Sequence, residues 1–249
     1  MKNRLVVGNW KMNGSLELIN TMLPEMTSQR AQCTAAVCVP SVYLARAAQV
    51  LADSELLVGA QDVSLAQRGA YTGEVSASML SELDCRFAIV GHSERRTRHG
   101  ETDEVIAEKA LRCLEAGIRP IICVGESQQQ RDIGRTAQVI GQQLDIVLDR
   151  LAAEAAISLE RIVVAYEPVW AIGNGRAASV EQAQDAHAYL RQRLGAKAAS
   201  LRDSVPILYG GSVTKANAAD LFAAPDIDGG LVGGASLSVS EFLAILHAA

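Results

Sequence analysis

The sequence predicts an α/β protein that folds as a single (β/α)8 barrel with eight parallel strands. Short β-branched apolar runs alternate with longer helical patterns eight times along the 249 residues. The runs lack the apolar–polar alternation of a half-exposed strand, which is typical of parallel strands buried on both faces. No Pro/Ser-rich linker or block of charge divides the chain, so we expect residues 1–249 to form one domain. An open, doubly wound sheet of eight strands is the alternative.

Each predicted strand is followed by a predicted helix. The strands are expected at Leu5–Asn9, Ala36–Pro40, Leu57–Gln61, Phe87–Gly91, Ile121–Val124, Ile162–Tyr166, Ile207–Gly210 and Gly229–Val232. The helices are expected at Leu16–Gln29, Val42–Ala52, Ala77–Glu82, Asp103–Ala116, Thr136–Ala155, Val180–Leu194, Lys215–Phe222 and Ser240–His247. One connection, Asp62–Ser76 after the third strand, is far longer than the usual roughly two to six residues. A loop of that length needs a purpose.

Composition argues against nucleic-acid and membrane partners. The net charge is -5, the pI is about 5.4 and 4% of residues are aromatic, so the chain lacks the basic stripe and stacking platforms that nucleic acids require. No apolar run approaches the roughly 18 residues of a membrane span, and the run at Leu5–Val7 is too brief for a signal segment. We therefore expect a cytoplasmic protein.

The cysteines are odd in number and show no Cys-x-x-Cys pair, which predicts reduced core residues rather than disulfides. They are Cys33, Cys38, Cys85, Cys113 and Cys123.

Glu167 is the first candidate for chemistry, because an apolar strand delivers it to a rim and Pro168 then ends the strand pairing. Residues 169–172 are too apolar for an ordinary surface loop and lead into Gly-Asn-Gly, which favours a lid over residues 168–178. The alternative is a strand-end ion pair at Glu167 with Trp170 buried in the core.

In a barrel the carboxyl ends of the strands converge on one face, so the residues after each strand can be grouped without a structure. These are Asn9, Lys11, Gln61, His92, Ser93, Glu94, Gly125, Glu126, Glu167, Gly211, Ser212, Gly233 and Gly234. Lys11 is either a solvated charge or a Schiff-base nucleophile. His92 is either a structural or a catalytic histidine. His99, His187 and His247 show no metal-ligand spacing, so we expect no metal.

Paired glycines end the seventh and eighth strands, at Gly210-Gly211 and Gly233-Gly234. Glycine lets backbone N–H groups approach an anion closely, and the loops after these two strands form the recurrent phosphate site of this fold. Tight packing explains either pair alone equally well, but the two pairs together favour a phosphate site.

The whole chain resembles the triosephosphate isomerase family, whose fold is the TIM barrel. The motifs that carry the resemblance are Asn-Trp-Lys-Met-Asn-Gly at 9–14, Gly-His-Ser-Glu-Arg-Arg at 91–96, Ala-Tyr-Glu-Pro-Val-Trp-Ala-Ile-Gly at 165–173, Tyr-Gly-Gly-Ser-Val at 209–213 and Leu-Val-Gly-Gly-Ala-Ser-Leu at 231–237. The resemblance implies a cofactor-independent isomerase that interconverts glyceraldehyde 3-phosphate and dihydroxyacetone phosphate through an enediolate. It also implies a homodimer, with the loop around Thr72 inserted beside the partner's active site.

The resemblance also assigns roles to individual residues. Glu167 becomes the general base, His92 a neutral electrophile and Lys11 an electrostatic stabiliser. The implied substrate-binding residues are Asn9, Lys11, Gly173, Ser212, Gly233 and Gly234, and the implied supporting residues are Glu94, Arg95, Cys123 and Thr72. The chain departs from the family pattern at Asn174, at Arg176–Ala178 and at Asp62. Two rival functions stay open: a Schiff-base aldolase using Lys11, and a sugar-phosphate-binding barrel without catalysis.

Overall fold

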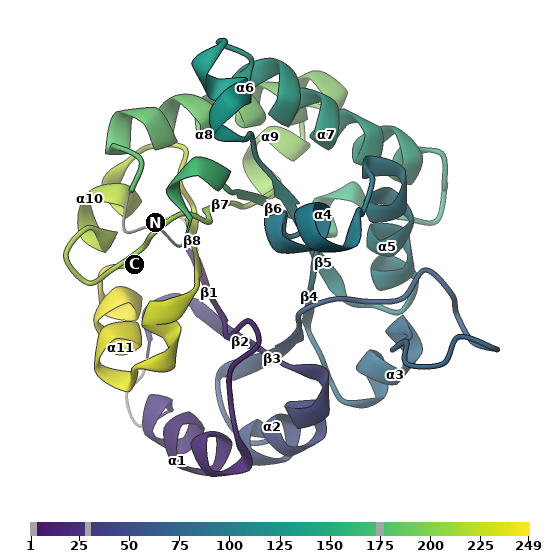
Figure 1. Ribbon diagram of the computed structural model, residues 1–249, viewed down its shortest axis with the longest axis vertical. Coiled ribbons are helices and arrows are strands. Elements are labelled where there is room, and N and C mark those ends of the chain that lie inside the picture. The colour runs from purple at the N-terminus through teal and green to yellow at the C-terminus, as the bar shows by residue number, and fades with distance from the viewer. Residues whose placement is uncertain (1–3, 28–30, 173–176) are drawn as a thin grey trace.

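The barrel predicted from the strand pattern is closed in the computed structural model, which describes residues 4–27, 31–172 and 177–249 (Figure 1). The eight strands are all parallel and lie in chain order, and β1 pairs with both β2 and β8. The open-sheet alternative is wrong, because the pairing of β1 with β8 closes the sheet into a barrel. The strands are β1 Leu5–Asn9, β2 Thr34–Val39, β3 Leu56–Ala60, β4 Phe87–Val90, β5 Arg119–Val124, β6 Val163–Tyr166, β7 Ile207–Tyr209 and β8 Gly229–Val232.

Helices surround the barrel, and several short ones were not predicted. The main helices are α1 Leu16–Met26, α2 Leu44–Leu51, α3 Ala77–Glu82, α5 Asp103–Glu115, α7 Thr136–Ala152, α8 Val180–Lys197, α10 Ala218–Ala223 and α11 Val239–His247. The additional ones are α4 Ser93–His99, α6 Gln128–Asp132, α9 Leu201–Ser204 and the 3-10 turns η1 Ser41–Tyr43, η2 Leu159–Arg161, η3 Val169–Ala171 and η4 Gly234–Leu237. Helix α4 reads Ser-Glu-Arg-Arg-Thr-Arg-His and has no apolar stripe, so periodicity could not reveal it.

Boundaries differ from the prediction by a few residues. Strand β5 begins two residues early and includes Pro120, which is tolerated near the start of a strand. Helix α10 begins at Ala218 rather than Lys215, because the side chain of Asn217 accepts hydrogen bonds from Thr214 in a preceding turn. The predicted end of the first helix, Gln29, lies outside the described residues.

The core has two layers, as expected for a barrel enclosed by helices. Alternate residues of the strands fill the barrel interior, and these are Leu5, Val7, Ala36, Cys38, Phe87, Ile89, Ile121, Cys123, Val163, Ala165, Leu208 and Leu231. A larger cluster lies between the strands and the helices. All five cysteines are free; Cys33 is half-buried and the others are buried, so the prediction of core positions is confirmed for four of them.

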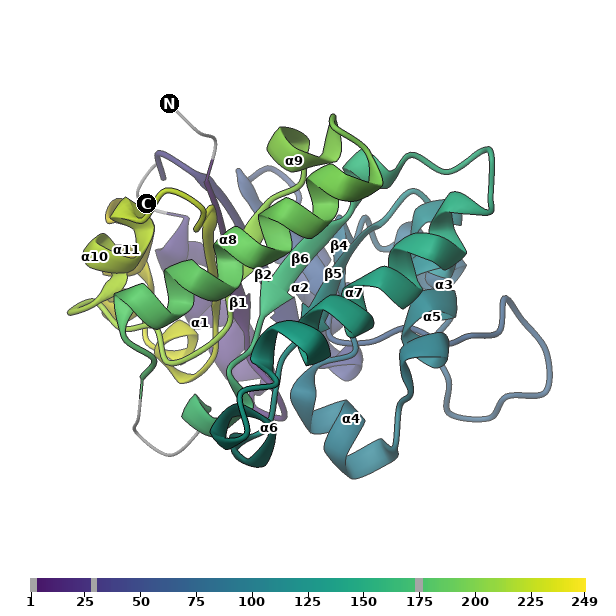
Figure 2. The same ribbon diagram turned by 90° about the horizontal axis from the view of Figure 1, so that it is seen from above.

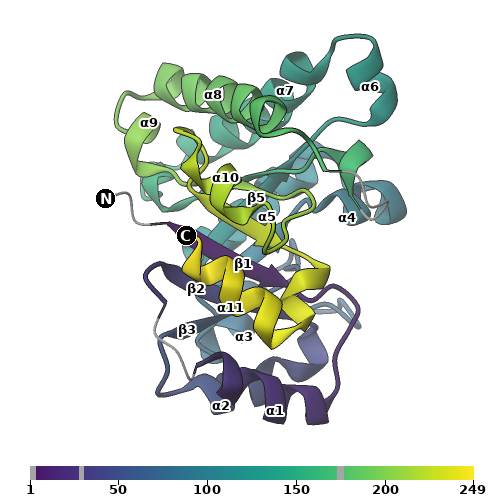
Figure 3. The ribbon, with the colours of Figure 1, turned by 90° about the vertical axis from the view of Figure 1, so that its left-hand side faces the viewer.

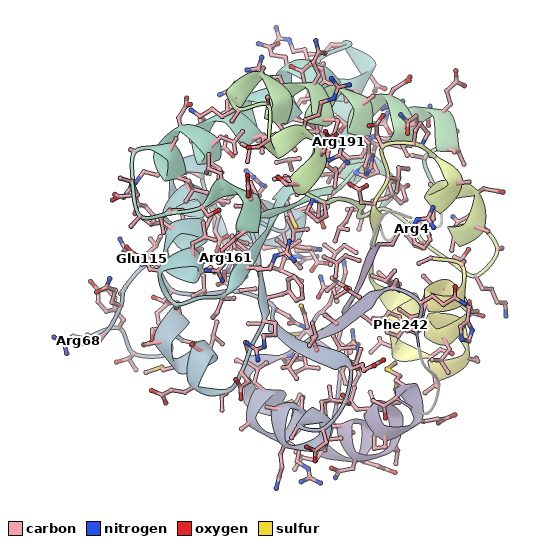
Figure 4. All side chains as sticks on the ribbon, turned by 180° about the vertical axis from the view of Figure 1, so that it is seen from behind. Arg4, Arg68, Glu115, Arg161, Arg191 and Phe242 are labelled. Atoms are coloured by element: carbon pink, nitrogen blue, oxygen red, sulfur yellow. The ribbon has the colours of Figure 1, made fainter. Side chains whose placement is uncertain are left out.

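The two ends of the barrel differ in what they carry. Helices α4 and α6 lie at the end where the strands finish, whereas the opposite end, seen in Figure 4, carries Arg4 just before β1. Arg4 donates to the backbone oxygens of Phe222 and Ala249, which ties the start of β1 to α10 and to the residue that ends the chain. Figure 3 shows α11 beside β1, and Figure 2 shows the loop 62–76 projecting from one side. Arg68 lies at the outer edge of that loop (Figure 4).

Candidate active site

Glu167 follows β6 directly and is almost fully buried, with a relative exposure of 2%. Its backbone N–H donates to the carbonyl of Val124 at 2.8 Å, so the end of β5 holds the residue in place. Its Oε2 accepts a hydrogen bond from the backbone N–H of Ser93 at 2.8 Å, and its Oε1 lies 2.9 Å from Nε2 of His92. The carboxylate predicted at a strand end therefore does lie at the barrel rim, in contact with the predicted histidine.

His92 is the N-cap residue of α4 and is also buried. Its Nδ1 accepts a hydrogen bond from the backbone N–H of Glu94 at 3.2 Å. An imidazole that accepts at Nδ1 carries its proton on Nε2 when it is neutral. The proton of His92 therefore points toward Glu167 and the mouth of the barrel.

Lys11 adopts a left-handed backbone conformation, with φ of 52°. Its backbone is held on both sides: its N–H donates to Oδ1 of Asn9 at 3.0 Å, and its carbonyl accepts from Nε2 of Gln61 at 2.9 Å. Its Nζ lies 2.7 Å from Oε1 of Glu94. Sequence reasoning placed Gln61 at the rim but gave it no role; its contact with the carbonyl of Lys11 becomes visible only when β1 and β3 are brought together.

The pKa values of the buried pair shift in opposite directions. Burial raises the pKa of Glu167, but the charge and hydrogen bond of His92 and the N–H of Ser93 lower it more, so the net shift is downward. Burial lowers the pKa of His92, but the charge and hydrogen bond of Glu167 outweigh burial and raise it. Each partner therefore stabilises the charged form of the other while they remain in contact.

A cavity of about 430 Å³ opens beside this pair. Its lining includes Asn9, Lys11, His92, Glu167, Ile172, Gly210, Gly211, Ser212, Leu231, Gly233 and Gly234. The structure thus brings together every predicted catalytic and substrate-binding residue that it describes. Gly173, the remaining one, lies outside the described residues.

The two glycine pairs have different surroundings. A Cβ at Gly210 would lie 2.9 Å from Cγ of Glu167, and a Cβ at Gly211 would lie 2.2 Å from the hydroxyl of Tyr209. A Cβ at Gly234 would meet nothing within 4 Å, and one at Gly233 would touch Lys11 at an ordinary 3.5 Å. Tight packing thus explains the first pair, whereas the second pair borders open space.

The two described flanks of the predicted lid are anchored by different side chains, Glu126 on one side and Tyr209 on the other. Glu126, fully buried, accepts hydrogen bonds from the indole of Trp170 at 2.8 Å and the hydroxyl of Tyr166 at 3.1 Å. On the other flank, the backbone N–H of Ala178 donates to the hydroxyl of Tyr209 at 3.2 Å. Trp170 is half-buried and packs against the edge of the hydrophobic cluster.

Comparison of the chain with known proteins points to one family. The family model described as triosephosphate isomerase matches residues 4–249. The chain belongs to the triosephosphate isomerase family. Among proteins named triosephosphate isomerase, that of Herminiimonas arsenicoxydans is 53% identical over 251 residues and that of Ralstonia nicotianae is 56% identical over 243 residues. The first alignment covers 100% of both chains and the second covers 97% of both.

The residues predicted to support the site are more scattered. Glu94 pairs with Lys11, and Cys123 lies in the barrel interior, where burial and the nearby charge of Glu167 raise the pKa of its thiol. Arg95 pairs with Asp62 at 2.8 Å and Glu101 at 2.6 Å, away from the 430 Å³ cavity. Thr72 is exposed on the projecting loop.

The described residues were compared with the requirements of a metal site and of a membrane span. Within the part of the chain that the structure describes, no three His, Cys, Asp or Glu residues are grouped so that they could hold a metal ion. Within the same residues, no helix is long and apolar enough to cross a membrane.

Proposed function

We propose that this protein interconverts glyceraldehyde 3-phosphate and dihydroxyacetone phosphate through an enediolate, without a cofactor. The observation that supports the proposal most directly is the convergence of a buried carboxylate, an imidazole N–H and an ammonium on one cavity at the strand ends. The relatives that match 97–100% of the chain carry the name triosephosphate isomerase.

The reaction needs a base and oxyanion stabilisation at the same time, because a carbon acid next to a carbonyl is weak. Glu167 removes the proton from carbon. His92 donates its Nε2 proton to the carbonyl oxygen, on which negative charge develops, and the ammonium of Lys11 stabilises that charge. His92 stays neutral in this scheme, which agrees with the N–H of Glu94 directed at its Nδ1.

The carboxylate must leave His92 to act, because a 2.9 Å contact leaves no room for a substrate atom between them. When Glu167 moves away, it loses the two contacts that lower its pKa, while burial, which raises that pKa, remains. Its basicity therefore rises. His92 loses the contact that raises its pKa, and burial with the charge of Lys11 then favours the neutral imidazole. The movement of Glu167 away from His92 therefore makes Glu167 a stronger base and keeps His92 neutral.

Lys11 is better suited to stabilise charge than to form a Schiff base. Its Nζ is held 2.7 Å from the carboxylate of Glu94, and an ion-paired ammonium has no lone pair for attack on a carbonyl. Borohydride treatment with substrate should therefore leave the protein unmodified, which separates this mechanism from the aldolase alternative.

The phosphate of the substrate binds beside Ser212, Gly233 and Gly234, where the open side of the second glycine pair admits an anion close to the backbone. Residues 168–178 act as a lid over it. Closure excludes water, which strengthens the donors around the oxyanion. Gly173 is expected to add a lid contact to the phosphate.

The protein acts as a homodimer, with Thr72 on the projecting loop reaching the partner. A second cavity of about 820 Å³ borders Asn9, Lys11 and His92 and is also lined by Gly73 and Glu74 of the loop. Met12 and Tyr71 are large apolar side chains exposed by 97% and 57% in the single chain. A partner covering this face would bury them and complete the wall of the active site.

The cytoplasmic location and the single domain over residues 1–249 stay predictions.

The test is a coupled assay of the purified protein and of Glu167→Gln, which removes the proton acceptor with little change in volume. General-base catalysis contributes typically ~10²–10⁴-fold, so turnover should fall at least that far. Circular dichroism checks that the variant folds. A loss of turnover below about tenfold would reject Glu167 as the base, and a wild-type protein that binds phosphate without isomerising triose phosphates would reject the function.

A further inference from the structure

The last residue of strand β5 and the two residues after it lie against the segment that begins at Glu167. The carbonyl of Val124 accepts from the N–H of Glu167 at 2.8 Å, and the carbonyl of Glu126 accepts from the N–H of Val169 at 3.2 Å. Between them, Gly125 packs so closely that a Cβ there would lie 1.8 Å from the carbonyl oxygen of Glu167. The position of Glu167 therefore depends on the position of the Gly125 peptide.

Strand pairing does not hold that peptide. The ladder between β5 and β6 ends at Val124 and Tyr166, one residue before Gly125. A backbone N–H and carbonyl beyond the end of a ladder need other partners. Both come from one side chain in α7: Oε1 of Gln143 accepts from the N–H of Gly125 at 2.7 Å, and Nε2 of Gln143 donates to the carbonyl of Gly125 at 3.3 Å.

We infer that Gln143 is a positioning residue for the isomerisation, acting through Gly125 to hold Glu167 in place. The inference rests on the proposed function. A primary amide offers an acceptor and a donor side by side, so it can replace a missing strand neighbour for a single residue. Gln143 does not contact the cavity itself, since it is absent from the residues that line it.

The experiment replaces Gln143 with Met, which keeps the length of the side chain but removes both hydrogen bonds, and with Glu, which keeps only the acceptor. Gln142 is the matched control, because it is the preceding residue of the same helix and is exposed. Gln142→Met and Gln142→Glu reproduce the changes in composition and helix propensity without touching Gly125.

The expected result is a fall in kcat with little change in KM. Displacement of a catalytic group by about 1 Å can cost ~10²-fold in rate, so a shift of tenths of an ångström should lower kcat of Gln143→Met by roughly tenfold. KM should change by less than about threefold, because the phosphate contacts come from other strands. Gln143→Glu should fall between Gln143→Met and wild type, and both Gln142 variants should match wild type.

The pH profile separates positioning from mere stabilisation. If Glu167 is displaced from Ser93 and His92, it loses the contacts that lower its pKa, so the acid limb of kcat/KM should move to higher pH in Gln143→Met. A variant with a lower Tm but with wild-type kcat and pH profile at 25 °C would show that Gln143 only stabilises the fold. If Gln143→Met does not fold, the same criteria apply to Gln143→Glu.

The outcomes also separate this inference from the proposed function. A wild-type protein without isomerase activity overturns both. An active wild type together with a Gln143→Met variant indistinguishable from Gln142→Met overturns the inference about Gln143 alone.

Discussion

Gly210→Ala is the substitution whose effect can be worked out most directly from the structure. Gly210 follows β7, and its backbone conformation is open to any residue, since its φ is not among the positive values of the described glycines. Space is the obstacle, because the new Cβ would lie 2.9 Å from Cγ of Glu167 and 3.2 Å from the carbonyl oxygen of Tyr166.

The size of the displacement follows from ordinary carbon–carbon contact, which lies at roughly 3.5–4.0 Å. Cγ of Glu167 must then move by about 0.6–1.1 Å, and because the carbonyl of Tyr166 is part of β6, the side chain will yield first. A displacement near 1 Å can cost ~10²-fold in rate, so we expect kcat to fall by roughly 10–100-fold.

The assay measures kcat and KM at 25 °C, with circular dichroism as the check on folding. Gly195→Ala is the control, since it lies in the outer helix α8 and its Cβ would meet the side chain of Arg202 at 3.3 Å, far from the cavity. A Gly210→Ala enzyme with kcat within twofold of wild type would refute the claim that Glu167 tolerates so little displacement.

Three further predictions concern the loop, the lid and the response to acid. Shortening the loop around Thr72 should shift sedimentation to the monomer and lower activity together; a fully active dimer would contradict the proposed interface. Deleting 171–174 should lower isomerisation and raise the fraction of glyceraldehyde 3-phosphate lost as methylglyoxal and inorganic phosphate; no rise in free phosphate would show that the lid only binds substrate. Burial lowers the pKa of His187 in the folded protein to about 4. Between about pH 6.5 and pH 4 the unfolded chain therefore binds a proton at His187 that the folded protein does not bind, so stability falls as the pH drops through that window. The loss attributable to His187 should be about 3 kcal/mol, measured by urea unfolding at pH 7 and pH 4 as the difference between wild type and His187→Gln; an equal loss in both proteins would exclude His187 as the source.

The fold and the grouping of the site could be predicted because both depend on local signals. Eight apolar runs mark the strands, and parallel strands in a barrel bring their carboxyl ends to one face, so Lys11, His92 and Glu167 could be grouped in advance. Helix α4 could not be predicted, since it lies at the rim and buries little apolar surface. Its first turn nevertheless fixes the tautomer of His92 through the N–H of Glu94.

The contacts that position these residues could not be predicted, because each joins segments far apart in the chain. Gly210 looked like part of a phosphate loop, but its lack of a Cβ makes room for Glu167, which follows another strand. Gln143 lies within the amphipathic helix α7, where a glutamine gives no signal in sequence. Residue type and spacing suggest which groups react. The neighbours that hold those groups are identified only when the strands and helices are placed in three dimensions.

Lys11 shows why these positioning contacts are necessary. A left-handed backbone costs a non-glycine residue roughly 1–2 kcal/mol, so an isolated chain would rarely place Lys11 at φ of 52°. The hydrogen bond that Lys11 donates to Asn9 and the one it accepts from Gln61 each contribute about 0.5–1.5 kcal/mol, which is enough together to offset that cost. The ammonium is thus fixed by β1 and β3, while its carboxylate partner, Glu94, belongs to the helix that presents His92. Because the compensating contacts come from the ends of both β1 and β3, these strands must pair through β2 before Lys11 is held in position. Loss of that pairing would therefore displace Lys11 even if no catalytic residue is changed.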